Sequence, residues 1–404
     1  MVAFILSITL LPALATILPV SVKPRESKTL KIMSQLAEWV IAKQKTLLIG
    51  GGLLALLLIA IIPRNELNDV FVEYFDERIE FRTDTDFIVE NLTGIYYVDY
   101  SIDTKTSGNI SEPQVLADIK KFTDWLDSQK EVIHVNSVTD TFTRLNKNMH
   151  GDDESFYKLP DSRELAAQYL LLYEMSLPFG LDLNNQIDID KKSTRISVTL
   201  ETLSTKQILE FEQRVDSWMT DNIPALKAVG ASPSIMFAHI GMKNIISMLA
   251  GTTIALILIS LILILALKSW RYGLLSLIPN LVPAGIAFGI WALIDGEIGL
   301  ALSVVTAMTL GIVVDDTIHF LGRYKIEIDK GVENTLAIQN SMRTSGGAIF
   351  LTTLIFVAGF GVLTTSAFYA NFMTGLLISI GMLMALLCDL YLLPVILHWL
   401  RKGK

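Results

Sequence analysis

Long apolar stretches constrain the fold of this chain more than any other feature of its sequence. A helix needs roughly 20 apolar residues to cross the hydrocarbon core of a bilayer, and 51% of the 404 residues here are hydrophobic. We therefore expect a polytopic α-helical membrane protein with about seven transmembrane helices. The apolar stretches lie near residues 2–20, 47–62, 245–267, 274–294, 299–321, 347–368 and 372–397.

The charged residues divide the chain into two environments. Residues 64–240 contain 31 acidic and 17 basic residues, whereas Lys and Arg gather in short connections elsewhere. Connections rich in Lys and Arg tend to stay in the cytoplasm. Alternate crossings place four such connections (23–45, 268–271, 323–343 and 401–404) on one side, so the acidic region is expected outside the cell membrane.

The acidic region has the pattern of an α+β domain. Strand-like segments at 94–102, 131–138 and 194–200 alternate with an amphipathic helix over 112–129 and with a helix that follows Ser204, a residue suited to N-capping. These segments predict βαβ-type units in two small subdomains, one on each side of a helical stretch.

Six consecutive regions follow from these patterns. They are a transmembrane helix (1–22), a cytoplasmic amphipathic linker (23–45), a second transmembrane helix (46–63), the extracytoplasmic α+β domain (64–240), a five-helix transmembrane bundle (241–400) and a cytoplasmic tail (401–404).

The linker has apolar positions at helical spacing. Leu30, Met33, Ala37 and Val40 fall on one side of residues 28–43, which predicts an amphipathic helix. The helix lies either on the cytoplasmic membrane surface or against the rest of the protein.

Two adjacent aspartates lie inside the apolar stretch that begins near residue 299. Asp315 and Asp316 are followed by His319, and on a helix these side chains and Thr309 fall within about 120° of arc, so we expect them to share one polar face. A carboxylate in hydrocarbon is costly unless it is paired, neutralised or hydrated. Ion or proton handling is therefore the leading hypothesis. The alternatives are that the aspartates reach cytoplasmic water or hold helices together.

Another embedded carboxylate, Asp389, lies in the last apolar stretch beside Cys388, the single cysteine. Asp389 and Thr309 serve either in a proton relay or in packing.

Several other protein classes lack support in the sequence. The five histidines are scattered, and no metal-spaced cluster, phosphate-binding glycine loop or nucleophile elbow occurs. We therefore expect no enzymatic activity, metal, cofactor or nucleic-acid partner. An intramembrane aspartyl protease would need aspartates on two helices in a glycine-containing context, which the VVDD sequence does not provide.

Four segments resemble, in order and spacing, the last five membrane helices of the resistance-nodulation-division superfamily, and most closely its MMPL-type predicted exporters. They are KSWRYGLLSLIPNLVPAGIAFGI, GIVVDDTIHFLGRYK, TTLIFVAGFGVLTTSAFYANF and ALLCDLYLLPVIL. A weak repeat of Leu-Leu-Pro, at Pro12 and Pro394, ties the two ends of the chain together. It suggests that the chain is the C-terminal half of a larger transporter.

The resemblance implies an exporter driven by the proton-motive force, which moves a hydrophobic or lipid-like substrate. It further implies a bacterial inner-membrane location, a periplasmic porter-like domain, and proton carriage at Asp315 and Asp316 with His319 beside them. The expected partners are membrane lipids, the substrate, and a first-half polypeptide or a second copy. Multidrug pumps of the superfamily place a lysine on the tenth helix, and the later apolar stretches here contain none, which favours the MMPL type.

Two alternatives remain open at this point. The chain is either a non-transporting sensor or assembly module similar to the sterol-sensing relatives, or a fragment that is inactive until a partner half covers its acidic residues.

Overall fold

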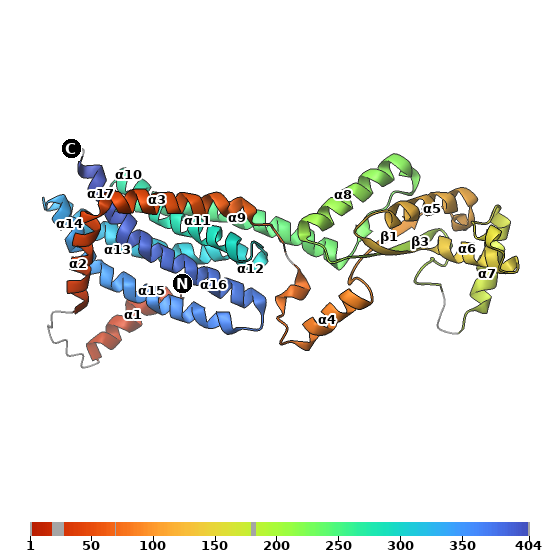
Figure 1. The fold of residues 1–404 in the computed structure, drawn as a ribbon, viewed down its shortest axis with the longest axis horizontal. Coiled ribbons are helices and arrows are strands. Elements are labelled where there is room, and N and C mark those ends of the chain that lie inside the picture. Colours follow the sequence, from red (N-terminus) through yellow and green to blue (C-terminus); the bar gives the residue numbers. More distant parts are fainter. Residues whose placement is uncertain (1, 18–27, 69, 179–182, 403–404) are drawn as a thin grey trace.

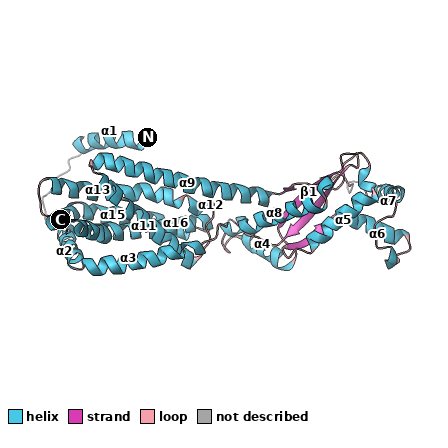
Figure 2. Cartoon of the chain, turned by 90° about the horizontal axis from the view of Figure 1, so that it is seen from above, coloured by secondary structure: helices cyan, strands magenta, loops and turns pink. Residues whose placement is uncertain are grey.

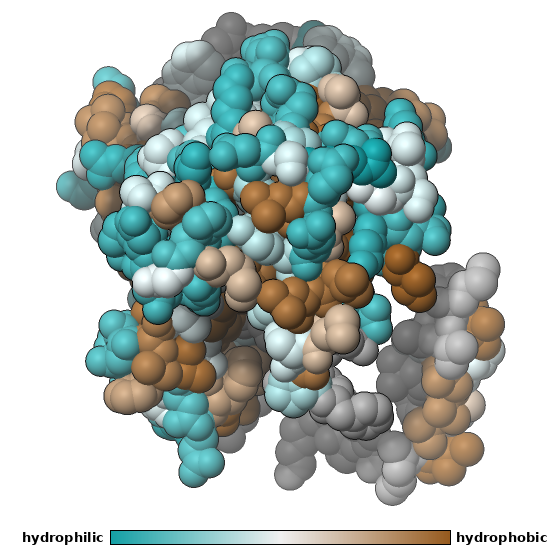
Figure 3. Space-filling view, turned by 90° about the vertical axis from the view of Figure 1, so that its right-hand side faces the viewer, coloured by the Kyte–Doolittle hydropathy of each residue, from teal (hydrophilic) through white to brown (hydrophobic). Residues whose placement is uncertain are grey.

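A computed structural model describes residues 2–17, 28–68, 70–178 and 183–402. A helical bundle occupies one end of the long axis and a smaller α+β domain occupies the other (Figure 1). Seen from the domain end, the surface is mostly hydrophilic (Figure 3), as expected of a part that lies in water.

Six helical segments among the described residues are long and apolar enough to cross a membrane. The chain is therefore a multi-pass membrane protein. The segments are α3 (Gln44–Ile61) with η1 (Ile62–Arg64); α9 (Pro233–Leu267); α10 (Trp270–Leu275) with α11 (Leu277–Ile294); α12 (Leu300–Ser303) with α13 (Val305–Asp329); α14 (Asn334–Ser341) with η6 (Met342–Gly346), α15 (Gly347–Gly361) and η7 (Val362–Thr365); and α16 (Tyr369–Leu387) with η8 (Cys388–Leu392) and α17 (Leu393–Lys402).

The first expected crossing, residues 1–22, is described only as helix α1 (Val2–Ile17). This helix runs along the outside of the bundle (Figures 1 and 2). Its 16 residues span about 24 Å, less than the hydrocarbon core of about 30 Å. A seventh crossing therefore stays a prediction.

Helix α2 (Lys28–Ala42) lies in the linker, as its pattern predicted, and packs against the rest of the protein. Met33, Ala37 and Val40 are buried against the end of the bundle that lies away from the α+β domain, mainly against η6, α14 and α17. Ile32 and Trp39 remain exposed. The helix therefore packs on protein with one face and offers apolar side chains to its surroundings with another.

The α+β domain contains one antiparallel sheet with the strand order β2-β3-β1-β4. Its strands are β1 (Tyr96–Asp103), β2 (Val132–Asn136), β3 (Ser193–Leu200) and β4 (Gly230–Ala231). Helix α5 (Pro113–Asp127) connects β1 to β2, and α8 (Thr205–Asn222) connects β3 to β4. Each connection skips one strand, as in a ferredoxin-like βαββαβ fold.

The predicted division of this domain into two subdomains is wrong. Strand β1 pairs with β3 along its whole length. Tyr96 lies opposite Leu200 at one end, and Asp103 lies opposite Ser193 at the other. The two strands alternate buried and less buried residues, and their inward side chains form one core with α5 and α8. Local strand patterns did not indicate which strands pair. The predicted N-cap is confirmed, because Ser204 forms a capping box with Gln207.

Helices inserted between β2 and β3 form a smaller apolar cluster at the far end of the domain. The insertion contains α6 (Val138–Met149), η4 (Glu154–Phe156) and α7 (Arg163–Ser176). The remaining elements are η2 (Phe71–Tyr74), α4 (Glu80–Asn91), η3 (Asn109–Ser111) and η5 (Pro224–Leu226).

Two connections join the domain to the bundle. Helix α9 begins directly after β4, where Ser232 caps it, and continues without a break for 35 residues, or about 52 Å. The second connection consists of residues that follow α3. Asn68 donates to Glu297 Oε1 at 3.0 Å and accepts from the backbone N–H of Thr205 at 3.1 Å, so it contacts both the α11–α12 loop and the domain.

Candidate functional site

The embedded aspartates lie near the middle of a membrane-spanning segment. Helices α12 and α13 together cover 30 residues, Leu300–Asp329, or about 45 Å. Asp315 and Asp316 are therefore far from both ends of this segment. The apolar stretch of the segment ends near residue 321, a few residues after the aspartates, so access to cytoplasmic water stays an alternative.

Asp316 points into the bundle. Its residue is 8% exposed, and its Oδ1 lies 3.4 Å from the hydroxyl oxygen of Thr352 on α15. The carboxyl group therefore lies between two membrane-spanning helices of the same chain, with a hydroxyl donor on one side.

Asp315 and His319 point away from the bundle. Their side chains are 70% and 69% exposed, and His319 Nε2 lies 3.5 Å from Asp315 Oδ1. Met308 and Gly311 are exposed on the same side of α13. We call the exposed stripe formed by Met308, Gly311, Asp315 and His319 the outer face of α13.

The expectation of one shared polar face is thus wrong. Adjacent residues on a helix are about 100° apart, and the neighbouring helices cover only part of the circumference of α13. The boundary of this covered arc falls between Asp315 and Asp316. Thr309 is on the covered side, where its hydroxyl donates to the backbone oxygen of Val305 at 2.9 Å.

A second polar group is completely enclosed in the bundle. Asp389 is 0% exposed and lies in η8, where the helix widens for one π-helical turn. The hydroxyl oxygen of Thr317, on α13, is 3.0 Å from Asp389 Oδ1 and 3.3 Å from Asn280 Oδ1, on α11. Three helices thus contribute to one polar cluster, which we call the Asp389 cluster.

The hydrogen bonds of the Asp389 cluster are incomplete among the described residues. The Thr317 hydroxyl has one proton and can donate to only one of the two oxygens near it. Asp389 Oδ2 and Asn280 Nδ2 are buried and have no hydrogen-bond partner there. No ion pair among the described residues includes Asp389, although an unpaired charge in a membrane interior is very unfavourable.

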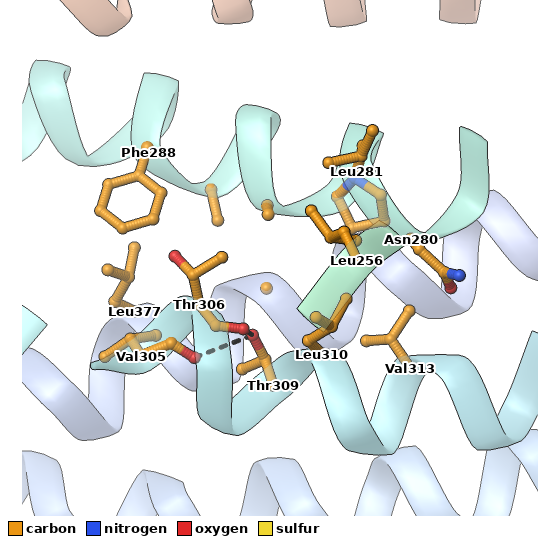
Figure 4. A pocket seen from close by; sticks show the side chains of 14 residues that line it. Leu256, Asn280, Leu281, Phe288, Val305, Thr306, Thr309, Leu310, Val313 and Leu377 are labelled. Carbon is orange, nitrogen blue, oxygen red and sulfur yellow. Dashed lines mark hydrogen bonds between the residues drawn. The ribbon is translucent and has the colours of Figure 1, made fainter. Parts of the chain in front are cut away.

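A small cavity of about 30 Å³ adjoins this cluster between α9, α11, α13 and α16. Asn280 and Val313 lie at one end and Phe288, Val305 and Leu377 at the other (Figure 4). This volume is comparable to the space of one water molecule, and the hydroxyls of Thr306 and Thr309 are in its wall.

A third acidic group lies outside the membrane-spanning segments, where the domain meets the bundle. Glu73, Asp295 and Glu297 line one open hollow. Partial desolvation, followed by the negative charge of Glu297, raises the pKa of Glu73 above its usual range. The same two causes, in the same order, raise the pKa of Asp295. Among the described residues, no group of three or more His, Cys, Asp and Glu side chains is arranged to hold a metal ion.

Sequence patterns missed several members of these groups. Thr317 and Thr352 are hydroxyl residues in apolar stretches, and such residues are common in membrane helices. Asn280 stood out only as an interruption between Pro279 and Pro283. These residues could have been predicted only from their position along the membrane-spanning segments, at the same level as the aspartates.

Comparison with known proteins places the chain among membrane proteins of one kind. A family model described as the MMPL family matches residues 185–402, more than half of the chain. The chain belongs to the MMPL family. The matched part contains β3, β4 and all five later membrane-spanning segments, so both the Asp389 cluster and the outer face of α13 lie within it.

Two curated relatives match parts of this MMPL-family chain. A protein of Methanocaldococcus jannaschii, named only as a membrane protein, is 28% identical over 146 residues, which are 36% of this chain and 38% of the relative. The apo-petrobactin exporter of Bacillus anthracis is 26% identical over 149 residues, 34% of this chain and 20% of the relative. The chain thus aligns with well under half of the length of each.

Proposed function

We propose that this chain is the C-terminal half of an exporter driven by the proton-motive force, with Asp315, Asp316 and His319 as its proton relay. The observation that carries the proposal is that the two aspartates, within one membrane-spanning segment, lie on opposite sides of the boundary between the covered and uncovered faces of α13. Asp316 is covered by α15, and Asp315 with His319 is uncovered. A proton that passes from one carboxyl to the other moves between the outer face and the bundle interior.

The uncovered face requires a cover. A carboxylate and an imidazole that face lipid are unfavourable, so the outer face of α13 is a contact surface for further membrane helices. The cover is a first-half polypeptide or a second copy of this chain. Without it, the chain is inactive.

The exported substrate is hydrophobic or lipid-like. The exporter name of the Bacillus anthracis relative supports export, and the long apolar segments give direct access to membrane lipids. The location consistent with this role is the bacterial inner membrane, with the α+β domain in the periplasm and no enzymatic step within the chain. A sensor or assembly role is the alternative outcome of the test.

The test uses the transporter with both halves, reconstituted in vesicles that contain a pH-sensitive dye and a fluorescent phosphatidylethanolamine as the export probe. Under an imposed proton gradient, Asp316→Asn and Asp315→Asn should each reduce proton flux and probe export to the level of protein-free vesicles. Asp329→Asn is the matched control, since Asp329 is on the same helix but is exposed at its end and paired with Lys325. Unchanged flux in Asp316→Asn would refute proton carriage and favour the sensor role.

A further inference from the structure

An apolar groove of about 280 Å³ lies between membrane-spanning segments on the side of α3. The described residues that line it come from α3, α11, α16 and η8, and none comes from α13, which carries the aspartates. On α3 they recur every three or four positions, at Leu47, Gly51, Leu54 and Leu58, and form one stripe about 16 Å long. The groove is therefore elongated along the membrane normal.

One of three consecutive glycines on α3, Gly51, lies in the wall of this groove. Gly50, Gly51 and Gly52 each have space for a Cβ atom, with no heavy atom of another segment within 4 Å. By contrast, a Cβ atom on Gly289 of α11 would lie 2.1 Å from the backbone oxygen of Leu58, so close helix packing explains that glycine. Glycine within a helix is about 1 kcal/mol less favourable than alanine. Close packing within this chain does not require a glycine at position 51. Gly51 lines the groove, so the space beside it is available to a ligand.

The cytoplasmic end of the groove has features that suit a lipid headgroup. Tyr391, in the groove wall, packs edge-to-face against the exposed Trp39 with ring centroids 6.2 Å apart. Aromatic residues of this kind are enriched at membrane–water interfaces. Lys43 precedes Leu47 by one turn, and its backbone oxygen accepts from the N–H of Leu47 at 3.0 Å. Lys43 is exposed, and no ion pair among the described residues includes it.

We propose that this groove binds one acyl chain of an anionic phospholipid from the cytoplasmic leaflet, with the phosphate near Lys43. The lining accepts an apolar chain, Gly51 provides the width, and the lysine provides the complementary charge. This lipid stays bound to the protein and is not its exported substrate, so the inference does not depend on the proposed function.

The first test is native mass spectrometry of the full chain taken from bilayers of dioleoyl phosphatidylglycerol and dioleoyl phosphatidylcholine in equal amounts. Wild type should retain one phosphatidylglycerol that Gly51→Leu loses, because leucine fills the groove. Gly52→Leu, on the next position of α3 but outside the groove lining, should retain it. Lys43→Gln should lower the preference for phosphatidylglycerol about fivefold, the effect of one basic residue near an anionic headgroup. Equal retention by Gly51→Leu and wild type would overturn the proposal.

A second measurement uses only the wild-type chain and remains informative if the glycine variants misfold. Phosphatidylglycerol with a photoactivatable diazirine on its acyl chain should label α3 and η8 at groove residues, above the labelling of the lipid-exposed part of α9. Labelling spread evenly over all membrane-spanning segments would overturn the proposal. So would protection of the groove by a bound protein.

Discussion

The two sides of α13 carry acidic groups in opposite environments. On the inner side, Asp316 meets Thr352 and the next residue, Thr317, meets Asp389 and Asn280. On the outer face, Asp315 has only His319, one turn away on the same helix. The inner groups therefore have partners on other helices of this chain, although Asp389 Oδ2 and Asn280 Nδ2 form no hydrogen bond among the described residues. The outer pair has a partner only on its own helix.

The two sides of α13 therefore serve two different requirements, stability of the bundle and assembly with other helices, although their acidic residues are adjacent in the sequence. The inner side contributes to the stability of the bundle, because removal of any member leaves buried polar atoms without partners. In the proposed transporter, the outer side contributes to assembly, because its groups gain partners on other helices only when the covering helices bind. Substitutions on the two sides should consequently affect different measurements.

The largest effect is expected for assembly. Asp315→Leu should reduce association with the partner half, or with a second copy, at least about tenfold, because truncation of a buried charged pair costs about 2–5 kcal/mol. The thermal unfolding of the isolated chain in detergent should change little. Energy transfer between labelled halves measures the association, and Met308→Leu on the same face is the control. Equal association of Asp315→Leu and wild type would show that the outer face is not the contact surface.

The next effect concerns the inner side. Thr317→Val removes the hydroxyl that links Asp389 to Asn280 and should destabilise the isolated chain by about 1–3 kcal/mol, the penalty for a buried polar group left unsatisfied. Chemical unfolding in detergent measures it. Thr253→Val is the matched control, because Thr253 is on the exposed side of α9 and bonds only to its own backbone. A loss no greater than in Thr253→Val would contradict the importance of the cluster.

Sequence periodicity could predict the membrane-spanning segments and the strands, but not their neighbours. Apolar length identifies each crossing, and alternation identifies β1 and β3. Neither pattern contains the information that β1 pairs with β3 or that Asp389 meets Thr317, 72 positions earlier. Sequence patterns also could not predict that Asp316 is buried and Asp315 exposed, because this depends on which side of α13 the neighbouring helices cover.

The smallest effect is expected for the pH dependence of stability, and it concerns carboxyl groups outside the membrane-spanning segments. Because the pKa of Glu73 is raised, the folded state holds its proton more tightly, and the associated stability is lost as pH rises through the raised value. Glu73→Gln should therefore be more stable than wild type at neutral pH and equal to it in acid. Thermal unfolding across the pH range measures this.

Asp76 provides the control of opposite sign. Its hydrogen bond with Arg78 lowers its pKa, so its contribution is present at neutral pH and is lost as pH falls through the lowered value. Asp76→Asn should be less stable than wild type at neutral pH and approach it in acid. The same pH dependence in both variants would contradict these assignments.

Helix α9 has a mechanical consequence. It leaves β4 and reaches Lys268 as one uninterrupted rod, so no joint absorbs a change in the tilt of the sheet. A rocking of 10° about its outer end would sweep the inner end by about 9 Å. A tilt of α9 at the domain end is thus coupled to a displacement at its other end, near Lys268.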